Sequence, residues 1–476
     1  MAVKFGTSGL RGLSTDLVGS VSALYATAFA RFLLDEGIAR PGSPVVIAQD
    51  FRPSSPDIVA TVIGALRRLG LSPIDCGAIP TPALALYGGK LGAAGIMVTG
   101  SHIPADRNGI KFYRPGEEIT KADEAAITKL AEALSNDAEP NRIEAGTAEN
   151  QERAATDLFL ARNTAVLPPE ALKGLRIGIY QHSTVARDML VKVFEHYGAT
   201  VFPLGRSEQF IPVDTEAVSD ETVRLMAHWT DELSLDAIVS TDGDGDRPLV
   251  ADEHGQPLRG DLLGLVATRF LGAKLVATPV TSNSGLEAAG GFDVVRTRVG
   301  SPFVIAAMEE ALAADRQGVI GFEANGGLML GSDFEVAGGV LKALPTRDSF
   351  LPALAVLGTA AKAGQSLSAL ATAYSLPVAL SDRLENFAVE RSAALMAHLR
   401  ASPDNLAGFV APLGQVKSVS DIDGLRVTLA DDSVVHVRPS GNAPEMRCYV
   451  EAKDQAAAEA LLAKGLATLS VWTPQT

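Results

Sequence analysis

Short apolar runs alternate with amphipathic segments over the first three quarters of the chain. Residues 45–50 (VVIAQD) open with a continuous apolar run, which is typical of a strand covered on both faces. Pro56 begins a segment whose apolar side chains share one helical face, and Gly70 ends it. A helix over 81–91 and a strand over 94–99 complete a strand–helix–strand unit. The pattern predicts a doubly wound, parallel sheet.

The same alternation of apolar strands and amphipathic helices occurs twice more along the chain. The second and third cycles are predicted at strand 175–180, helix 185–197, strands 200–204 and 237–241, then strand 275–279, helix 302–314 and strand 318–322. Mixed polar residues around Pro140 make 139–146 a predicted linker. Residues 248–258 are a predicted hairpin that turns at His254 and Gly255.

The last hundred residues follow another pattern. Segments 425–429, 434–438 and 446–452 alternate apolar and polar positions, with a turn at 430–433, and a helix is expected from Gln455 to about Leu469. This alternation is typical of an antiparallel sheet with one face covered. The predicted fold class is therefore α/β, with three related α/β domains and a smaller C-terminal α+β domain. The expected domains are 1–148, 149–253, 254–376 and 377–476.

Composition narrows the class of protein. The 476 residues suffice for about three domains, and 47% apolar with 20% charged residues is typical of globular chains. The net charge of −15 argues against general nucleic-acid binding, because an acidic surface repels a phosphodiester backbone. Cys76 and Cys448 form no metal or redox motif, which fits a cytoplasmic location. Residues 1–12 do not resemble a signal peptide, and no apolar run approaches about 18 residues, so no membrane span is expected.

Glycine and proline, with 45 and 26 residues, are in slight excess and point to elaborate loops. The first such loop, 99–111 (TGSHIPADRNGIK), follows an apolar strand, where open α/β sheets bind ligands. Small neighbours leave the hydroxyl of Ser101 open to a reactant, and His102 and Lys111 are candidate proton-handling groups. A plain surface turn is the competing interpretation. A hydrolase nucleophile elbow is excluded, because Thr99 stands at the first glycine position.

The second loop, 241–247 (TDGDGDR), alternates three carboxylates with glycines that permit tight curvature. Asp242, Asp244 and Asp246 offer the hard oxygen ligands that Mg²⁺ or Ca²⁺ prefers, and they repel one another without a cation. An EF-hand is excluded, because Arg247 stands where that loop needs glycine and a strand precedes it. The loop predicts a divalent-metal site, with a plain acidic turn as the alternative.

Three further loops carry weaker signals. In 321–327 (GFEANGG), Glu323 and Asn325 can hydrogen-bond the vicinal hydroxyls of a sugar, although a glycine-rich turn is the simpler interpretation. Segment 438–447 (RPSGNAPEMR) is a candidate phosphate cradle, and its alternative is a hairpin loop with two solvated arginines. Segment 6–12 (GTSGLRG) indicates an anion-facing turn, and it lacks the lysine of a P-loop.

Together, these segments resemble the α-D-phosphohexomutase superfamily, most closely its bacterial phosphomannomutase/phosphoglucomutase members. The motifs stand in the family's order as G-T-S-G-L-R-G at 6–12, T-x-S-H-x-P at 99–104, D-G-D-G-D-R at 242–247, G-x-E-x-x-G at 321–326 and R-P-S-G-x-x-P at 438–444. The resemblance spans almost the whole chain and implies a central cleft between the four domains. It implies a phosphohexomutase that interconverts hexose 1-phosphate and hexose 6-phosphate, of mannose, glucose or both. The implied route is a phosphoserine enzyme and a hexose 1,6-bisphosphate intermediate.

The resemblance also implies roles for individual residues. Ser101 carries the phosphoryl group and, through it, joins the Mg²⁺ ligands Asp242, Asp244 and Asp246. Residues beside the serine are linked to proton transfer or charge stabilisation, with the identity of the base open: Arg11, His102, Lys111 and Arg247. The implied sugar-binding and phosphate-binding residues are Glu323, Asn325, Arg438, Ser440, Gly441, Asn442 and Arg447. Small hexose phosphates are the expected partners, without nucleic acid or membrane.

The sequence departs from the family pattern mainly where sugar and phosphate are recognised. Asn325-Gly326-Gly327 replaces a frequent Ser-Gly-His, Asn442-Ala443 replaces Thr-Glu, and Ser301 stands where relatives carry histidine or another polar residue. The choice among mannose, glucose and glucosamine phosphates therefore stays open, and phosphoglucosamine mutase is the alternative within the class. The alternatives from other classes are a non-catalytic protein that binds sugar phosphate or metal, and a phosphatase that uses the same metal site.

Overall fold

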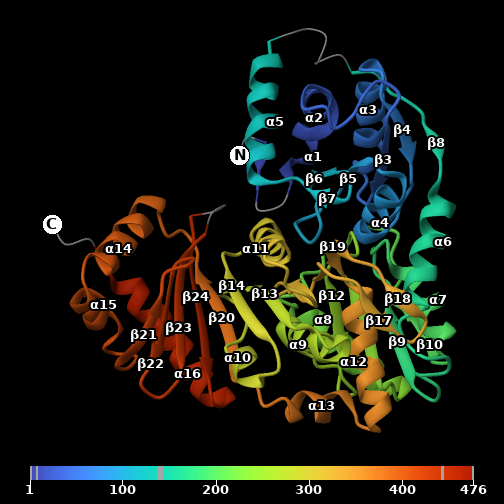
Figure 1. Cartoon of the computed structure of the whole chain (residues 1–476). Coiled ribbons are helices and arrows are strands. Elements are labelled where there is room, and N and C mark those ends of the chain that lie inside the picture. Colours follow the sequence, from blue (N-terminus) through green and yellow to red (C-terminus); the bar gives the residue numbers. More distant parts are fainter. Residues whose placement is uncertain (1–2, 7–8, 137–142, 441–443, 474–476) are drawn as a thin grey trace.

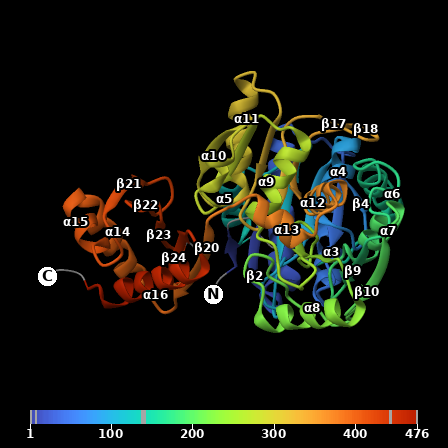
Figure 2. The ribbon, with the colours of Figure 1, turned by 90° about the horizontal axis from the view of Figure 1, so that it is seen from below.

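The computed structural model describes residues 3–6, 9–136, 143–440 and 444–473. Three α/β domains form one body, and the C-terminal domain stands beside it (Figure 1; Figure 2). A continuous apolar core joins the three α/β domains, whereas the C-terminal domain has an apolar core of its own. The predicted fold class, three α/β domains followed by an α+β domain, is confirmed. The separate core allows the C-terminal domain to move as a unit.

The first domain is built on a mixed sheet with the order β1-β2-β6-β5-β3-β4-β8. Its strands are β1 (Lys4–Phe5), β2 (Leu10–Leu13), β3 (Pro44–Gln49), β4 (Ser72–Asp75), β5 (Ala94–Val98), β6 (Arg107–Arg114), β7 (Glu117–Glu118) and β8 (Glu149–Asn150). Its helices are α1 (Ser14–Asp16), α2 (Ser22–Asp35), α3 (Ser55–Arg68), α4 (Thr81–Leu91), α5 (Lys121–Leu134) and α6 (Glu152–Asn163). Helices α2, α3 and α5 pack on one face, and α4 and α6 on the other.

One segment of this domain, Ser14–Asp35, has the length and composition of a membrane span, with a mean hydropathy of 1.5. It is the one such helix in the described part of the chain, and it corrects the expectation that no apolar run approaches this length. Of its most apolar window, 61% is buried inside the fold, where α2 packs against α3 and α5. This burial is typical of the core helix of a folded domain.

The second and third domains repeat the arrangement. The second contains β9 (Arg176–Tyr180), β10 (Thr200–Leu204), β11 (Ala237–Thr241), β12 (Pro248–Ala251), α7 (Arg187–His196) and α8 (Asp220–Leu233). The third contains β13 (Leu275–Pro279), β14 (Asp293–Thr297), β15 (Val319–Phe322), β16 (Leu328–Leu330), β17 (Phe334–Val336), β18 (Gly339–Leu341), β19 (Leu344–Asp348), α9 (Gly260–Leu271), α10 (Gly285–Ala289), α11 (Ser301–Ala313), α12 (Phe350–Ala363) and α13 (Leu367–Ala373). The sheet orders are β10-β9-β11-β12 and β14-β13-β15-β16-β19.

The C-terminal domain is an antiparallel sheet with the order β20-β24-β23-β22-β21. Its elements are β20 (Val378–Leu384), α14 (Val389–Ala401), α15 (Pro403–Val410), β21 (Val416–Ser420), β22 (Leu425–Leu429), β23 (Val434–Pro439), β24 (Met446–Ala452) and α16 (Gln455–Val471). Helix α16 packs against β20, β23 and β24. The sequence predicted the last three strands and α16, but it did not predict β20, β21, α14 or α15.

The sheets differ from the predicted parallel ones in a way that shapes the loops. Strands β5, β11 and β15 each lie parallel to a neighbour on one side, and each is followed by an antiparallel strand, β6, β12 or β16. The three polar loops are therefore hairpin connections rather than strand-to-helix connections. Lys111, expected in the first loop, lies on β6 instead. The hairpin predicted at 248–258 is reduced to β12 and one bridge from Ala251 to Pro257.

Candidate active site

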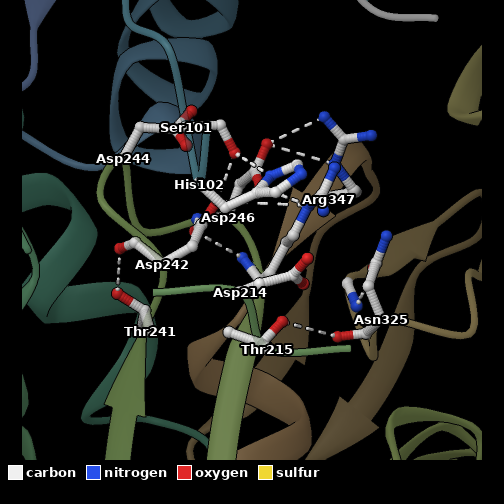
Figure 3. A network of polar contacts seen from close by, with 12 residues as sticks. Ser101, His102, Asp214, Thr215, Thr241, Asp242, Asp244, Asp246, Asn325 and Arg347 are labelled. Carbon is white, nitrogen blue, oxygen red and sulfur yellow. Dashed lines mark hydrogen bonds and ion pairs between the residues drawn. The ribbon is translucent and has the colours of Figure 1, made fainter. Parts of the chain in front are cut away.

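The three hairpin loops converge on one site at the junction of the α/β domains (Figure 3). Contacts between domains join them: Ser101 reaches Asp242, and Arg347 of the third domain reaches Asp246. The site therefore collects side chains from all three α/β domains. This is the edge of an open α/β sheet at which ligands bind.

Ser101 lies in the first loop, 1% exposed and with a left-handed backbone (φ 54°). Its hydroxyl donates to Oδ2 of Asp242 at 2.5 Å and lies 3.2 Å from Nδ1 of His102. Its N–H donates to Oγ1 of Thr99 at 2.7 Å. A left-handed conformation costs a residue with a side chain about 1–3 kcal/mol and persists only where its surroundings enforce it. The serine is therefore held with its hydroxyl against the aspartates.

Asp242, Asp244 and Asp246 form a fully buried carboxylate cluster. Their candidate ligand atoms lie within 4.8 Å of one another, and Gly245, with φ 73°, lets the backbone turn that tightly. Oδ1 of Asp242 accepts the N–H groups of Asp246 and Arg247, each at 3.1 Å. The other Oδ1 atoms, on Asp244 and Asp246, have no hydrogen-bond partner among the described residues. Because buried carboxylate oxygens need a partner and hard cations prefer such ligands, the donor set fits a divalent metal ion.

Three cationic side chains face the cluster. Lys111 Nζ donates to Oδ2 of Asp244 at 2.6 Å and to Oδ2 of Asp246 at 2.7 Å. Arg347 donates to Oδ2 of Asp246 through Nε at 3.1 Å and Nη2 at 2.9 Å. Arg247 Nε lies 3.8 Å from Oδ1 of Asp246. These contacts offset the negative charge of the carboxylates. Through Lys111 and Arg347 they also form ion pairs between the three α/β domains.

The same charges change the pKa values of the buried acids and of the lysine. Burial, together with Asp244 and Asp246, raises the pKa of Asp242 well above its usual range. Burial favours a higher pKa for Asp246 too, but Arg347 and Lys111 outweigh it and lower that pKa. Burial favours a lower pKa for Lys111, but Asp244 and Asp246 outweigh it and raise that pKa. The lysine is therefore held in its cationic form.

The basic groups beside Ser101 differ in charge. The pKa of His102 is lowered, first by the charge of Arg247, then by burial, and then by the charge of Arg11. Its ring is therefore neutral near pH 7. Burial, followed by Arg247 and Arg347, lowers the pKa of Arg11 to about 10, which leaves this guanidinium charged. The serine therefore lies between a neutral imidazole and several permanent cations.

Arg347 is a site residue that the sequence motifs did not identify. It lies on β19, is 2% exposed, and its Nη1 donates to Oε2 of Glu323 at 2.9 Å. One guanidinium therefore fixes both the aspartate loop and the third loop. Its sequence signal is the charged pair Arg347-Asp348 immediately before an apolar helix.

Replacing Arg347 by methionine is expected to lower the free energy of unfolding by about 3–5 kcal/mol, because it leaves Asp246 and Glu323 buried without their partner. Urea unfolding followed by circular dichroism measures the change. The matched control is Arg316→Met, which removes an exposed pair with Asp293 and should cost less than about 1 kcal/mol. Equal losses in the two variants would contradict the assignment.

Glu323 and Asn325 both lie in the third loop, 6% and 5% exposed. Oδ1 of Asn325 accepts the N–H of Gly327 at 3.0 Å and so is used within its own turn. Oε2 of Glu323 accepts from Arg347 at 2.9 Å and from Nδ2 of Asn325 at 3.5 Å, and its Oε1 has no hydrogen bond to a described residue. Glu323 is therefore the better placed of the two to accept a hydroxyl from a ligand.

The expected phosphate-binding residues lie at one end of the C-terminal sheet. Arg438 on β23 and Arg447 on β24 are register partners, and Ser440 donates its N–H to the carbonyl of Glu445 at 2.9 Å. Arg438 Nε lies 2.9 Å from a carboxylate oxygen of Asp423. The other expected residues, Gly441 and Asn442, lie outside the described part of the chain.

A third arginine extends this row. Arg383 on β20 is the register partner of Arg447, so three arginines lie side by side across three strands. Like charges directly opposite one another repel, and Glu445 lies 3.6 Å from Arg383 and 3.7 Å from Arg447. Sequence reasoning missed Arg383, because β20 was not predicted. A row of three cations fits an anionic group better than two arginines alone.

A cavity of about 250 Å³ separates the C-terminal domain from the body. Its lining combines Glu216 and Gly260 of the body, Ala324 of the third loop, and Tyr449 and Glu451 of the C-terminal sheet. This hollow lies between the second, third and C-terminal domains, on one side of the expected central cleft. It provides room between the third loop and the C-terminal sheet.

Sequence models of one family match all four domains. Alpha/beta/alpha domains I, II and III of phosphoglucomutase/phosphomannomutase match residues 2–138, 159–255 and 260–375, and the C-terminal domain of that family matches residues 384–466. Fold and site thus define a mutase, an enzyme that moves a phosphoryl group within its substrate. The chain belongs to the phosphoglucomutase/phosphomannomutase family.

Individual relatives agree with this assignment. A phosphomannomutase of Sinorhizobium fredii is 60% identical over 470 residues, which cover 99% of each chain. A phosphomannomutase of Salmonella muenchen is 42% identical, covering 95% of this chain and 92% of that one. Two relatives named phosphoglucosamine mutase, from Desulforamulus reducens and Rhodococcus erythropolis, are 27% and 31% identical over at least 96% of this chain. The crystal structure of a phosphoglucomutase/phosphomannomutase family protein from Burkholderia thailandensis shares the fold, with a TM-score of 0.76 at 22% identity and coverage of 98% and 96%.

Proposed function

We propose that this chain interconverts hexose 1-phosphate and hexose 6-phosphate, with mannose or glucose as the sugar, through a phosphoserine at Ser101. One observation carries the proposal: the buried Ser101 hydroxyl lies 2.5 Å from a carboxylate of a three-aspartate cluster. A protein that only binds sugar phosphates needs no nucleophile there. The 60% identity to a phosphomannomutase supports mannose phosphates, whereas the lower identity of the phosphoglucosamine mutases speaks against that alternative.

The reaction consists of two phosphoryl transfers. In the first, a free hydroxyl of the bound sugar monophosphate attacks the phosphorus on Ser101, and the bond from phosphorus to Oγ breaks. The hydroxyl proton passes to a base of the site, and hexose 1,6-bisphosphate forms. The bisphosphate then turns over in the cleft. In the second transfer, Oγ of Ser101 gives up its proton and attacks the other phosphorus, and the bond from that phosphorus to the sugar oxygen breaks. The sugar oxygen takes up a proton, so the isomeric monophosphate is released and phosphoserine is restored.

The buried charges fit this chemistry. Asp242, Asp244 and Asp246 would hold Mg²⁺, which supplies positive charge beside the transferring phosphoryl group. Lys111 and Arg247 are held close to the same position by their contacts with the aspartates. Preorganised cations of this kind stabilise negative charge in a transition state without reorganisation.

Recognition of the sugar is divided between two domains. Glu323 would accept sugar hydroxyls, and Asn325 shapes the same loop. Residues of the C-terminal domain would hold the phosphate that is not transferred: Arg438, Ser440, Gly441, Asn442 and Arg447. Because that domain has its own core, it can adjust to either end of the bisphosphate and close the cleft against water. We further propose a cytoplasmic location, small hexose phosphates as partners, and the domain limits 1–148, 149–253, 254–376 and 377–476. The start of the second segment lies against the first domain, because β8 pairs with β4 and α6 packs on α4.

The decisive experiment compares kcat/KM for mannose 1-phosphate, glucose 1-phosphate and glucosamine 1-phosphate in coupled assays with Mg²⁺ and glucose 1,6-bisphosphate. We expect turnover with mannose or glucose phosphate and almost no inorganic phosphate. A preference for glucosamine 1-phosphate would identify the alternative mutase. Stoichiometric release of inorganic phosphate would identify a phosphatase, and binding without turnover a non-catalytic protein.

Replacing Arg447 by methionine is expected to raise the KM for the sugar phosphate about 10- to 100-fold, because a charge-assisted contact contributes about 1.5–3 kcal/mol. The Mg²⁺ concentration for half-maximal activity should stay unchanged, since Arg447 lies in another domain from the aspartates. Arg400→Met is the control, because Arg400 forms an exposed pair with Asp421 in the same domain. An unchanged KM in Arg447→Met would contradict the proposed phosphate site.

A further inference from the structure

The backbone of the serine loop is held by a residue outside every motif of the site, Arg52. This side chain follows β3 and is 1% exposed. Its Nη2 donates to the carbonyls of Ser101 at 3.0 Å and Ile103 at 2.6 Å, and its Nη1 donates to those of Pro104 and Arg107, each at 2.7 Å. A guanidinium can bind four carbonyls at once because its donors lie in a fixed plane. The loop is thus held around this one side chain.

Asp50 completes the support from the other side. Its Oδ2 accepts Nε of Arg52 at 3.2 Å and the hydroxyl of Thr99 at 2.7 Å. A side chain at Gly100 would lie 2.6 Å from the Arg52 guanidinium, so the loop needs glycine there to approach it. The left-handed backbone of Ser101 (φ 54°) is therefore enforced by contacts on both sides.

A residue of the second domain fixes Arg52 against the aspartate loop. The Phe210 ring lies 4.0 Å from the centre of the Arg52 guanidinium, a cation–π contact across the domain boundary. The same ring packs on Gly243, between Asp242 and Asp244: a side-chain carbon there would lie 3.0 Å from the ring and 3.0 Å from the Ser101 carbonyl. Phe210 therefore touches the support of one catalytic loop and the backbone of the other.

We propose that Arg52 and Phe210 are positioning residues that set the Ser101 hydroxyl against the Asp242 carboxylate for phosphoryl transfer. Neither side chain touches the reacting atoms. Arg52 fixes the shape of the serine loop, and Phe210 fixes the distance between that loop and the aspartate loop. Because misplacement of reacting groups by about 1 Å can cost about 100-fold in rate, such a contact acts on the chemical step rather than on substrate affinity. This inference rests on the proposed mutase function.

A second arginine–phenylalanine pair at the same boundary provides the control. Arg187 of the second domain lies 4.4 Å from the ring of Phe51 in the first domain. Its Nη1 donates to the carbonyls of His182 and Ser207, and the described contacts include none to the serine loop. The two pairs thus lie at the same domain boundary and make the same type of contact, but the Arg52–Phe210 pair supports the serine loop and the Arg187–Phe51 pair does not.

The test compares Phe210→Leu and Arg52→Lys with Phe51→Leu and Arg187→Lys, in the full chain with Mg²⁺. Two quantities are measured: steady-state kcat and KM with mannose 1-phosphate, and the rate at which glucose 1,6-bisphosphate phosphorylates Ser101, followed by intact mass. Phe210→Leu and Arg52→Lys should lower kcat and the phosphorylation rate by about tenfold or more, with KM within about threefold. The control variants should stay within about twofold of the parent in every quantity.

The outcomes separate the inference from the proposed function. Phe210→Leu with parental kcat, a rise in KM alone, or equal losses in Phe210→Leu and Phe51→Leu would each overturn the positioning role. If Arg52→Lys does not fold, the comparison of Phe210→Leu with Phe51→Leu decides the question. Absence of turnover in the parent chain would instead refute the mutase function itself.

Discussion

Replacing Ser101 by alanine is expected to lower kcat by about 10⁴-fold or more, because the variant has no group at this position that can carry the phosphoryl group. We expect no other single substitution in this chain to have a larger effect. The loss follows from geometry: the Ser101 hydroxyl lies against Asp242, inside the cluster of carboxylates and cations. Binding of the sugar phosphate should survive, since the residues proposed to hold it lie in other domains. Coupled assays measure turnover, and calorimetry with the inactive variant measures binding.

Intact mass gives the same prediction a second measurement. Parent protein incubated with glucose 1,6-bisphosphate should gain one phosphoryl group at Ser101, and Ser101→Ala should gain none. Ser392→Ala is the control, because Ser392 is also a buried serine, with its hydroxyl bonded to the carbonyl of Val389 in the C-terminal domain. Parental turnover in Ser101→Ala, or phosphorylation elsewhere in the chain, would refute the phosphoserine mechanism.

Buried parallel strands were the most predictable part of the fold. The predicted strands 237–241 and 275–279 coincide with β11 and β13, which are buried at every position, whereas the predicted strand 200–204 coincides with β10, a partly exposed edge strand. A strand covered on both faces must be apolar at nearly every position, so it is visible in the sequence without any alignment. The loops that follow such strands then fall at the carboxyl edge of a sheet, and this rule alone predicts that Ser101 and Asp242 each lie at a ligand-binding edge.

Elements that carry buried charge were not predictable. Strand β6 contains the buried polar residues Asn108 and Lys111, so its sequence resembles a surface loop. Burial of Lys111 is tolerated because its ammonium group donates hydrogen bonds to the carboxylates of Asp244 and Asp246. Strand β21 shows the opposite case, since it is a mostly exposed edge strand without an apolar signal. In both strands, the residues that stabilise the strand lie in other parts of the chain, so the strand's own sequence does not reveal it.

The residues that connect the site's loops were missed for the same reason. Arg347 contacts Asp246 across 101 positions of sequence, and Arg52 contacts the Ser101 carbonyl across 49. Local periodicity describes one element at a time and carries no information about such pairs. A lone arginine beside a strand is usually solvated, so only the packed structure distinguishes these two from the surface arginines.

The electrostatics of the aspartate cluster favour a bound cation. Three carboxylates, all fully buried, face Lys111, Arg247 and Arg347, yet in the described part of the chain two of their Oδ1 atoms have no hydrogen-bond partner. Like charges at this separation in a poorly hydrated site are costly. The protein's own cations thus offset part of the negative charge, and the two Oδ1 atoms are the places where a divalent ion would add most to this balance.

Asp244→Asn is therefore expected to lower Mg²⁺-dependent kcat by about 10³-fold or more, since a bound metal contributes several kcal/mol to the transition state. The Asp244 carboxylate accepts hydrogen bonds from Nζ of Lys111 and from the hydroxyl of Thr81, each at 2.6 Å. Asparagine keeps the shape of this side chain but removes one negative charge from the cluster. Two readouts test it: activity against MgCl₂ concentration, and the rise in Tm that Mg²⁺ gives the parent chain by binding the folded state. Both should disappear in Asp244→Asn and persist in the control Asp188→Asn, whose carboxylate forms an exposed pair with Arg206 in the same domain. A parental Mg²⁺ response in Asp244→Asn would show that the aspartate cluster does not hold the metal.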